Sequence, residues 1–465
     1  MKRFLSLLLL AVLLTGCAAP GVQPEQKQYN ATFLDVFDTV TTVVGKAESE
    51  EAFREQAQQV HEILQVYHQL FDIYNDYEGV NNLKTVNDNA GIAPVKVDEP
   101  IITLLKHCKS YYEMTDGMVN PAMGTVLQLW HVARNDGVND PAHAYLPKEE
   151  KLREAAEYMD FDAVIIVTPH TSHVPIGMQM AKLGKHILMD KPAGISAGEV
   201  EELVHCCEEH KVTFSMIFHN RCLPAFAKAR EMVRSGALGT LHRAVWICNS
   251  WYRTPAYHRS APWRSSWNGE CGGLMINQNP HYLDMWNWFF GLPDKVYAAL
   301  EFGRYNDFDV DDAADIQFSY NSGFHGTMIS ATGEAPGVNR LEIWGSKGKL
   351  TVEDGKILTL DENEMTTEAF AASNQEVFTM LPHKTRQLPL EAEGIPYLKV
   401  MAQFVKTVLT GAPPVADGWD GLREVQLANA IYVSGWEECR VALPVAEARY
   451  LEGLYRRQRK EQEKT

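Results

Sequence analysis

The stretch MDFDAVIIVTPHTSHVP, residues 159–175, decides the fold of the longer part of this chain. Residues 163–167, AVIIV, form a short, uninterrupted apolar run, which is typical of a strand buried in a parallel sheet. A Thr-Pro-His turn follows and opens a helix. Such a strand is usually a middle strand of a nucleotide-binding sheet, but no G-x-G-x-x-G loop stands before it or anywhere else in the sequence. The first strands of that sheet are therefore absent.

The residues after this stretch continue the alternation of strands and helices. The runs HILMDKP (186–192) and VTFSMIF (212–218) each follow a helical pattern, which predicts a parallel α/β sheet. Beyond about residue 240 the pattern changes. KVYAALEFG, DIQFSYNSGFHGTMISA and RLEIWGSKGKLTVEDGKILTL alternate and turn at glycine, which predicts an antiparallel sheet.

The composition is that of an ordinary globular protein, with 45% hydrophobic and 22% charged residues. The chain is long enough for about two to four domains. Its formal net charge of −17 disfavours a nucleic-acid partner held by a broad basic surface. The basic run RRQRK at 456–460 is predicted to be the frayed, solvated end of a helix in a polar tail, 451–465.

The N-terminal segment MKRFLSLLLLAVLLTGCAAP has the features of an export signal. Lys2 and Arg3 precede an apolar run that is too short to span a bilayer. The Leu-Thr-Gly-Cys ending resembles a bacterial lipobox, with lipidation at Cys17 and a tether at 18–29. A buried N-terminal helix is the alternative. The lipobox predicts an extracytoplasmic protein anchored by lipid to the cell membrane.

The remaining cysteines indicate a different compartment. Seven remain, an odd number without C-x-x-C spacing, which argues against a disulfide framework and against a structural zinc site. They are typical of reduced thiols in a protein of cytoplasmic origin, and six of the seven lie after residue 200. The export signal and the thiols therefore conflict.

Residues 30–160 combine strand-like and helical patterns. The expected elements, in chain order, are a strand at 33–45, a helix at 49–71, a polar loop at 74–91, and helices ended by Gly117, ended by Gly137 and opened at Pro147.

Residues 1 to about 166 closely resemble the N-terminal part of bacterial lipoprotein FAD:protein FMN transferases of the ApbE type. The lipobox, FDTVTTV, IYNDYEGVNNLKTVNDNAG and TDGMVNPAMGTVLQLWH carry the resemblance. It implies that Tyr74 and the stretch Met118, Val119 and Asn120 help to hold FAD. The catalytic and magnesium-binding segments that the family carries later are absent from 161–465, so no magnesium or other metal site is expected.

From mid-sheet onward the chain resembles the Gfo/Idh/MocA family of NAD(P)-dependent oxidoreductases. DAVIIVTP, GKHILMDKP, FHNRCLPAF and GGLMINQNPHYLDMWNWFFG carry this resemblance almost to the C-terminus. It implies hydride transfer between NAD or NADP and a polyol, sugar or related alcohol, with weak or lost cofactor binding because the glycine loop is missing. The cofactor contacts that it implies are Thr168, Pro169, His173, Asp190, Lys191, Pro192, Arg221 and Gln278.

Two segments are candidates for the chemistry. Lys191 follows a strand at the carboxyl edge of the sheet, and the resemblance implies that it acts beside the nicotinamide and the substrate hydroxyl. His281 is predicted to take the alcohol proton, with Asp284 on the same helical face. Several family members have an aspartate where this chain has Asn277, which cannot relay a proton. A histidine buried in the core beside a Trp-rich helix is the alternative for His281.

The aromatic and Arg-rich stretch NSWYRTPAYHRSAPWRSSWNGE is a candidate substrate pocket. Aromatic faces such as Trp263 would lie against a sugar ring, while Arg264 or His258 would fix hydroxyl groups. An irregular loop pinned by its aromatic side chains is an equal alternative.

The predicted fold is α/β plus α+β: an incomplete flavin-transferase fragment, a truncated Rossmann-like parallel sheet, and a mostly antiparallel-sheet α/β substrate domain. The predicted domains are the signal at 1–17, the tether at 18–29, and domains at 30–160, 161–240 and 241–450, before the tail at 451–465.

Three interpretations stay open: an impaired oxidoreductase that can form oligomers through its C-terminal sheet, an incomplete flavin transferase, and a fusion without function. Since each part has lost sheet partners, the edge at 163–167 is expected to be uncovered. A protected core is expected between about 240 and 450, with 20–160 cleaved early.

Overall fold

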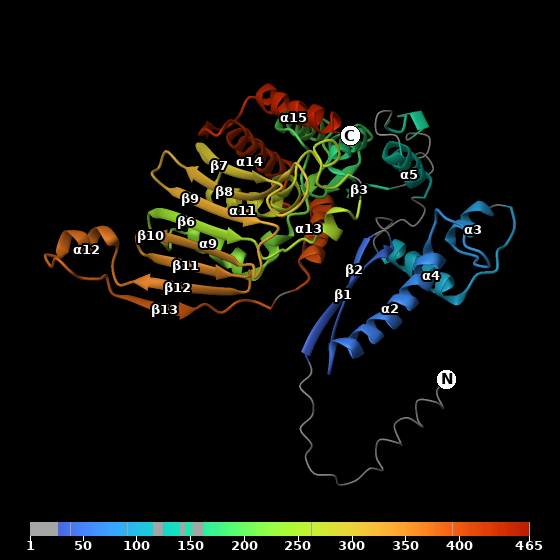
Figure 1. Cartoon of the computed structure of the whole chain (residues 1–465), viewed down its shortest axis with the longest axis horizontal. Helices are drawn as coiled ribbons and strands as arrows, with labels where there is room; N and C mark the ends of the chain where they lie inside the picture. The colour runs from blue at the N-terminus through green and yellow to red at the C-terminus, as the bar shows by residue number, and fades with distance from the viewer. Residues whose placement is uncertain are drawn as a thin grey trace, which may run out of the picture. The chain divides into compact units, whose positions relative to one another are not determined.

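The computed structural model describes residues 27–37, 39–90, 92–114, 124–139, 145–148, 150–151, 161–261, 263–392 and 394–464. They fall into two compact units that divide between Pro121 and Ala122 (Figure 1). The predictions for Cys17, for Met118, Val119 and Asn120, and for most of the helix opened at Pro147 lie outside the described residues. None of the described helices combines the length and the apolar character that a membrane-crossing helix needs.

The first unit is a hairpin packed against a helix. Its elements are β1 (Lys27–Val36), β2 (Thr39–Ala47), α2 (Glu50–Phe71), α3 (Leu83–Asp88) and α4 (Glu99–Met114). The single strand predicted at 33–45 is wrong, because the chain turns after Phe37 and returns antiparallel as β2. The predicted loop at 74–91 contains a short helix, α3, which Asn82 and Thr85 begin with reciprocal capping bonds.

The core of the first unit is small. Ala47, Phe53 and Ala57 form one buried apolar cluster, and Val36, Leu70 and Ile101 are also buried. The hairpin faces solvent along most of its length. A two-stranded hairpin with so little cover is only marginally stable in water.

The second unit begins with a parallel sheet of strand order β3-β4-β5. Its elements are β3 (Ala163–Ile166), η3 (His170–Ser172), α7 (His173–Lys182), β4 (His186–Met189), α8 (Ala197–Glu209), β5 (Phe214–Met216) and η4 (His219–Cys222). This confirms the predicted order of strands and helices. Among the described strands β3 pairs only with β4, and Ile165 and Val167 beside that edge are 49% and 65% exposed.

Helix α5 (Gly124–Asn139) joins the core of this parallel sheet. Leu129 and Trp130 pack against the cluster that contains Val164, Ile166 and Met189. A helix from the ApbE-like sequence therefore covers part of the truncated sheet, which is why the compact units divide before α5 and not at residue 160.

The second sheet has nine strands in the order β13-β12-β11-β10-β6-β9-β8-β7-β14, and only β6 and β9 run parallel. The strands are β6 (Leu241–Cys248), β7 (Lys295–Phe302), β8 (Asp311–Ser319), β9 (His325–Ala331), β10 (Asn339–Gly345), β11 (Gly348–Glu353), β12 (Ile357–Asn363), β13 (His383–Gln387) and β14 (Val441–Ala442). This confirms the predicted mostly antiparallel sheet.

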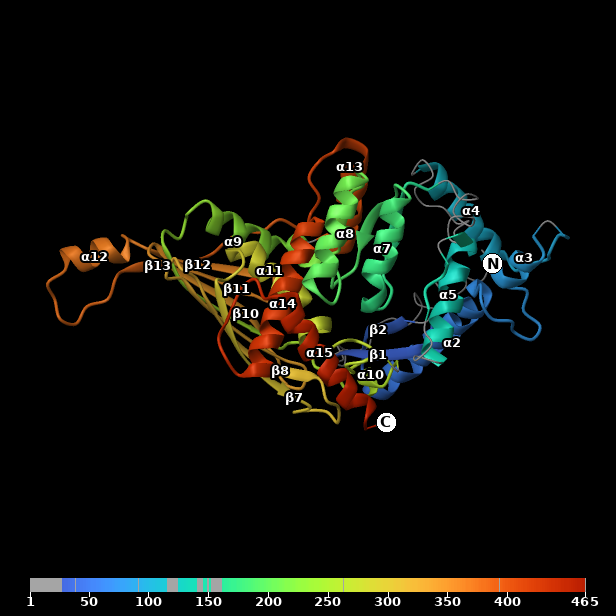
Figure 2. The same ribbon diagram turned by 90° about the horizontal axis from the view of Figure 1, so that it is seen from above.

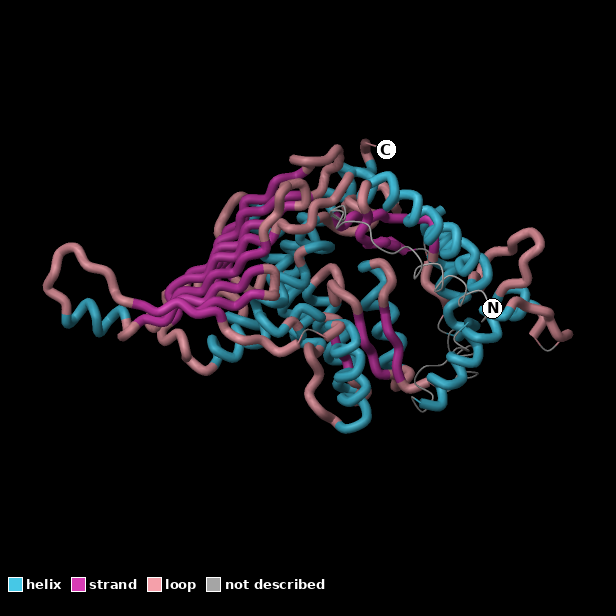
Figure 3. Tube along the Cα trace, turned by 90° about the horizontal axis from the view of Figure 1, so that it is seen from below, coloured by secondary structure: helices cyan, strands magenta, loops and turns pink. Residues whose placement is uncertain are grey.

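Helices α9, α11 and α14 gather on one face of this sheet (Figures 2 and 3). The helices of this region are α9 (Pro224–Arg234), α10 (Pro255–His258), α11 (Pro280–Phe290), α12 (Thr367–Ser373), α13 (Pro396–Thr410), α14 (Gly418–Glu437) and α15 (Glu447–Gln462). Large aromatic side chains, Trp246, Trp286 and Tyr432 among them, fill the space between helices and strands. This core is far larger than that of the first unit.

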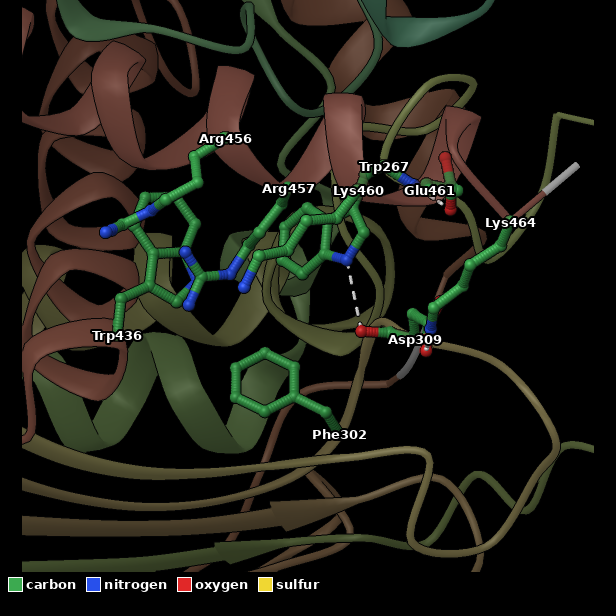
Figure 4. Close-up of a pocket in the computed structure, with 9 residues that line it drawn as sticks. All are labelled: Trp267, Phe302, Asp309, Trp436, Arg456, Arg457, Lys460, Glu461 and Lys464. Atoms are coloured by element: carbon green, nitrogen blue, oxygen red, sulfur yellow. Dashed lines mark hydrogen bonds and ion pairs between the residues drawn. The ribbon is translucent and has the colours of Figure 1, made fainter.

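The frayed end predicted at 456–460 is wrong, because α15 continues to Gln462 and contacts the rest of the unit, although Arg456, Arg459 and Lys460 are exposed, as the solvated end requires. Glu461 accepts hydrogen bonds from the backbone amides of Trp267 and Asn268, at 2.9 and 2.7 Å. The Arg457 guanidinium lies 4.3 Å from the centre of the Trp436 ring. A cavity of about 370 Å³ lies against this helix and is lined by Trp267, Phe302, Asp309, Trp436, Arg456, Arg457, Lys460, Glu461 and Lys464 (Figure 4).

Candidate functional site

The chain segments that follow β3, β4 and β5 come together at one edge of the parallel sheet. Thr168 and Pro169 follow β3, Asp190 and Lys191 follow β4, and η4 follows β5. Parallel strands end at the same edge, and ligands of open α/β sheets bind there. The structure therefore brings together most of the residues predicted to contact the cofactor.

His173 links two of these segments. Its ring nitrogens lie 2.7 Å from the carbonyl oxygen of Thr168 and 2.7 Å from that of Pro192. The ring is buried, and burial lowers the pKa of His173. The two nitrogens face carbonyl oxygens of the turns after β3 and β4, and the neutral ring can donate a hydrogen bond to one of them. The predicted contact of His173 with the cofactor stays a prediction.

Lys191 and Asn277 are in direct contact. Lys191 Nζ donates to the backbone oxygen of Asn277 at 2.5 Å and to its Oδ1 at 3.2 Å. Asn277 belongs to a π-helical turn, η5 (Leu274–Gln278), and π turns often occur at functional sites. The side-chain amide thus fixes the direction of the ammonium group.

Two other residues predicted to contact the cofactor are partly exposed. They are Gln278, at the end of η5, and Asp190.

The backbone at Gly272 and Gly273 lies close to neighbouring atoms. A Cβ atom on Gly272 would lie 2.1 Å from the Tyr432 hydroxyl, and one on Gly273 would lie 2.2 Å from the backbone oxygen of Asp311. The buried Asp311 carboxylate accepts from the amides of Gly273 and Met275, at 2.9 and 2.7 Å. Asp311 and Tyr432 therefore fix the turn that leads to η5, and sequence reasoning missed both.

His281 lies at the start of α11, with Lys191 close enough to affect its charge. Burial, and then the charges of His219 and Lys191, lower the pKa of His281 well below its ordinary value. The ring is therefore neutral near neutral pH, which is the form that accepts a proton. Its Nδ1 is buried and has no hydrogen-bond partner among the described residues.

A second imidazole lies beside His281, and sequence reasoning missed it. The ring centroids of His219 and His281 are 4.4 Å apart, and the His219 ring stacks on Tyr397 at 4.1 Å. Burial lowers the pKa of His219 to about 4. The position of His219, three residues after a buried strand, was the available signal.

Sequence reasoning also missed Glu270. Its side chain accepts from Asn277 Nδ2, and its Oε2 accepts from the backbone amide of Ser265 at 2.8 Å. Burial raises the pKa of Glu270 to about 7, although Arg264 and Lys191 oppose the rise. Asn277 therefore stands between a buried carboxyl group and the Lys191 ammonium.

Replacing Glu270 with glutamine is expected to stabilise the second unit relative to the chain that keeps Glu270, and this difference should grow as the pH rises. The folded protein holds the Glu270 proton up to about pH 7, whereas an unfolded glutamate loses it near its ordinary pKa of 4.5. Stability therefore falls as the pH rises between these two values. The glutamine variant does not have this loss, so its stability relative to the unmodified chain should rise by about 2–3 kcal/mol between pH 5 and pH 8. Urea unfolding at several pH values measures it, and a difference that does not vary with pH would contradict the pKa.

The aromatic and Arg-rich stretch lies next to Asn277. Tyr257 receives a hydrogen bond from Arg264 Nη1 at 2.9 Å and one from Asn277 Nδ2 at 3.5 Å. The Arg264 guanidinium also lies over the ring of Trp263, at 4.5 Å. His258 contacts Ser265 Oγ through Nδ1, at 2.6 Å. The predicted substrate residues Arg264, Trp263 and His258 are thus grouped around Tyr257.

Arg221 and Asp284 were predicted to contact cofactor and substrate, but the structure gives them a structural contact instead. Arg221 Nε and Nη2 donate to the Asp284 carboxylate at 3.0 and 2.5 Å, and Nη1 donates to Asp420 at 2.8 Å. The side chains of Arg221 and Asp284 are 4% and 1% exposed, so neither is free to face a ligand. Burial disfavours the Arg221 charge, but the two carboxylates outweigh it and raise the pKa of Arg221.

Tyr74, predicted to help hold FAD, lies in the first unit. Its backbone amide donates to Asp72 Oδ1 at 2.6 Å, in the turn that follows α2. Its predicted partners at 118–120 lie outside the described residues.

Two protein families match different parts of the chain. The ApbE family matches residues 34–217, and the GFO/IDH/MocA C-terminal domain matches residues 226–351. The chain is therefore a chimera of two parts, as the sequence predicts. The ApbE match extends over β3, β4 and β5, beyond the predicted join at 160–166, but these strands share their core with Leu422 and Val425 of α14. The position of the join stays a prediction.

Curated relatives resemble the longer part. An uncharacterized oxidoreductase of Bacillus subtilis, YrbE, is 25% identical over 276 residues, which are 58% of this chain and 75% of the relative. Myo-inositol 2-dehydrogenase of Thermotoga maritima is 24% identical over 298 residues, which are 62% of this chain and 82% of the relative. These homologues support the general interpretation of the longer part as an oxidoreductase.

Solved structures share the fold. The WlbA dehydrogenase of Bordetella pertussis, in complex with NADH and UDP-GlcNAcA, matches 68% of this chain and 88% of its own, with a TM-score of 0.52 and 21% identity. Levoglucosan dehydrogenase in complex with NADH matches 63% of this chain and 87% of its own, with a TM-score of 0.52 and 20% identity. The second unit therefore has the fold of these dehydrogenases.

Proposed function

We propose that residues 161–465 form the substrate-binding and nicotinamide-facing portion of a Gfo/Idh/MocA-type oxidoreductase that acts on a polyol, sugar or related alcohol. The observation that carries the proposal is the position of Lys191 and of the neutral ring of His281 at the carboxyl edge of the parallel sheet. The names of the relatives, among them a myo-inositol dehydrogenase and levoglucosan dehydrogenase, support the substrate class.

Lys191, Asn277 and His281 could have different roles in the oxidation of an alcohol. The Lys191 ammonium, held by Asn277, would bind the substrate hydroxyl oxygen and favour loss of its proton. The neutral His281 ring would accept that proton. Asn277 cannot pass a proton onward, so the proton would leave the His281 ring by exchange with solvent. A nicotinamide cofactor, when bound, supplies the hydride acceptor.

The residues present fit only part of such a cofactor. Lys191 and the turns after β3 and β4 form an edge where a nicotinamide ring can lie. The pyrophosphate normally binds backbone amides at a helix N-terminus after a glycine-rich turn, and the sequence has no such turn. We therefore expect impaired binding of both NAD and NADP.

Titration of the full chain with NADH or NADPH, followed by nucleotide fluorescence, is expected to give millimolar binding or no saturation. Reduced nicotinamide mononucleotide should bind about as well as NADH, because the adenosine half finds no site. Lys191→Ala should weaken both further. Micromolar NADH binding would contradict the impairment. Mononucleotide binding that is insensitive to Lys191→Ala would contradict the proposed nicotinamide position.

The ApbE match favours a second candidate function, a lipid-anchored FAD:protein FMN transferase. In this proposal Cys17 carries the lipid and Tyr74 and Asn120 help to bind FAD. Because the catalytic and magnesium-binding segments are absent from the sequence, we expect no transfer of FMN to a threonine of an acceptor protein. Incubation with FAD, magnesium and an acceptor protein, followed by gel fluorescence, measures this. A flavin-labelled acceptor band would overturn the expectation.

The third interpretation is a join that yields no working protein. A continuous sequencing read across codons 150–175 tests it. If no read crosses this region, the two parts are not encoded by one gene. Oligomers formed through the C-terminal sheet remain part of the first proposal, and molecular mass in solution tests them.

A further inference from the structure

Two arginine side chains lie over the ring of Tyr257. The guanidinium carbon of Arg253 is 5.0 Å from the ring centre and that of Arg264 is 4.7 Å from it. The hydrogen bonds described for these groups go to neutral oxygens: Arg253 Nη1 donates to the Tyr252 carbonyl, and Arg264 Nη1 donates to the Tyr257 hydroxyl. The Nε atoms of both arginines are buried and have no partner among the described residues.

This pair is continuous with the proposed site of oxidation. The Tyr257 hydroxyl accepts from Asn277 Nδ2 at 3.5 Å, and Asn277 Oδ1 accepts from Lys191 Nζ at 3.2 Å. A substrate whose hydroxyl group meets Lys191 would therefore extend toward Arg264.

The charged groups described over the ring of Tyr257 are both cations, Arg253 and Arg264. Glu270 is the buried carboxyl group that is joined to Tyr257 through Asn277. Burial keeps Glu270 partly protonated at neutral pH, because its pKa is raised to about 7. Burial, and then the two arginines, lower the pKa of His258 to about 4, so its ring adds no charge. The charge of the arginines is thus left for a ligand to neutralise.

We infer that Arg253 and Arg264 form an anion subsite beside Lys191, so that the substrate is an acidic sugar or polyol that carries a carboxylate. The inference rests on the proposed function and narrows its substrate class. A guanidinium binds a carboxylate through two parallel N–H bonds, and stacking on an aromatic ring holds its plane in place before the ligand arrives. The rings of Tyr257 and Trp263 provide that stacking for Arg264.

The test compares D-glucuronate with D-glucose, by calorimetric titration of the full chain without nucleotide. Glucuronate should bind at least about tenfold more tightly, because a hydrogen bond to a charged group contributes about 1.5–3 kcal/mol. Arg264→Gln and Arg253→Gln should each remove most of this preference, and Arg264→Lys should restore part of it. Arg259→Gln is the matched control, since Arg259 is exposed and lies in the same loop.

The outcomes separate this inference from the proposed function. Equal binding of the two sugars, both weakened by Lys191→Ala, would overturn the anion subsite and leave the oxidoreductase proposal standing. An equal loss of glucuronate binding in the Arg259 and Arg264 variants would also overturn the subsite. No binding of either sugar would overturn both proposals. Circular dichroism of each variant identifies a loss that comes from unfolding.

Discussion

Replacing Arg221 with methionine is expected to lower the free energy of unfolding of the second unit by about 3–5 kcal/mol. The Arg221 side chain joins three elements: it extends from η4 and bonds Asp284 of α11 and Asp420 of α14. It also donates to the backbone oxygen of Val415 at 3.1 Å. Without the guanidinium, Asp284, 1% exposed, must either keep a buried charge with no partner from Arg221 or take up a proton, since burial already raises its pKa to about 6. Urea unfolding followed by tryptophan fluorescence measures the change.

An exposed ion pair on the same unit provides the control. Arg386 and Glu362 lie 3.2 Å apart with side chains 58% and 55% exposed, so Arg386→Met should change stability by less than about 0.5 kcal/mol. Adding Asp284→Asn to Arg221→Met should recover part of the loss, because the unpaired charge is then removed. A loss below about 1 kcal/mol for Arg221→Met would show that the network does not hold these elements together.

Limited proteolysis is expected to remove residues before 115 while a fragment that contains 241–450 survives. The first unit has a small buried cluster, Ala47, Phe53 and Ala57, beneath an exposed hairpin, and few other buried apolar residues. The second unit encloses a large aromatic core between its helices and the nine-stranded sheet. Regions with few buried apolar contacts open at low free energy and are cut first. Mass spectrometry of the early fragments gives the order of cleavage.

Hydrogen exchange refines this prediction at the join. The sequence predicts early cleavage throughout 20–160, but Leu129 and Trp130 of α5 pack on the parallel-sheet core. Helix α5 should therefore exchange more slowly than α2 or α4. Equal protection from 27 to 464 would mean that the two parts have built one shared core, and the interpretation as a broken join would then be wrong.

The parallel sheet could be predicted because each of its strands is a short apolar run in the sequence. Residues 163–167, 186–189 and 214–216 need no tertiary information to be recognised as buried strands. Lys191 could be placed for the same reason, since it follows a strand whose carboxyl end must reach the binding edge. The local hydrophobic pattern was therefore enough to predict the parallel strands and the position of Lys191.

The residues that were missed depend on partners far away in the sequence. Asp284 shares a helix face with His281, which favoured a substrate role, but its carboxylate is taken by Arg221 from another element. Glu270 follows an irregular loop, and only the folded chain brings it against Asn277. The basic run in α15 looked like a frayed end because nothing local reveals the ring of Trp436 beneath Arg457.

The π-helical turn at Leu274–Gln278 has a consequence for the position of His281. A π-helical turn closes its hydrogen bonds one residue later than an α-helical turn. Deleting one residue there would rotate everything after it by about 100° around the helix axis. The ring of His281 would then leave the site. The position of His281 therefore depends on the number of residues in this turn as well as on its own side chain.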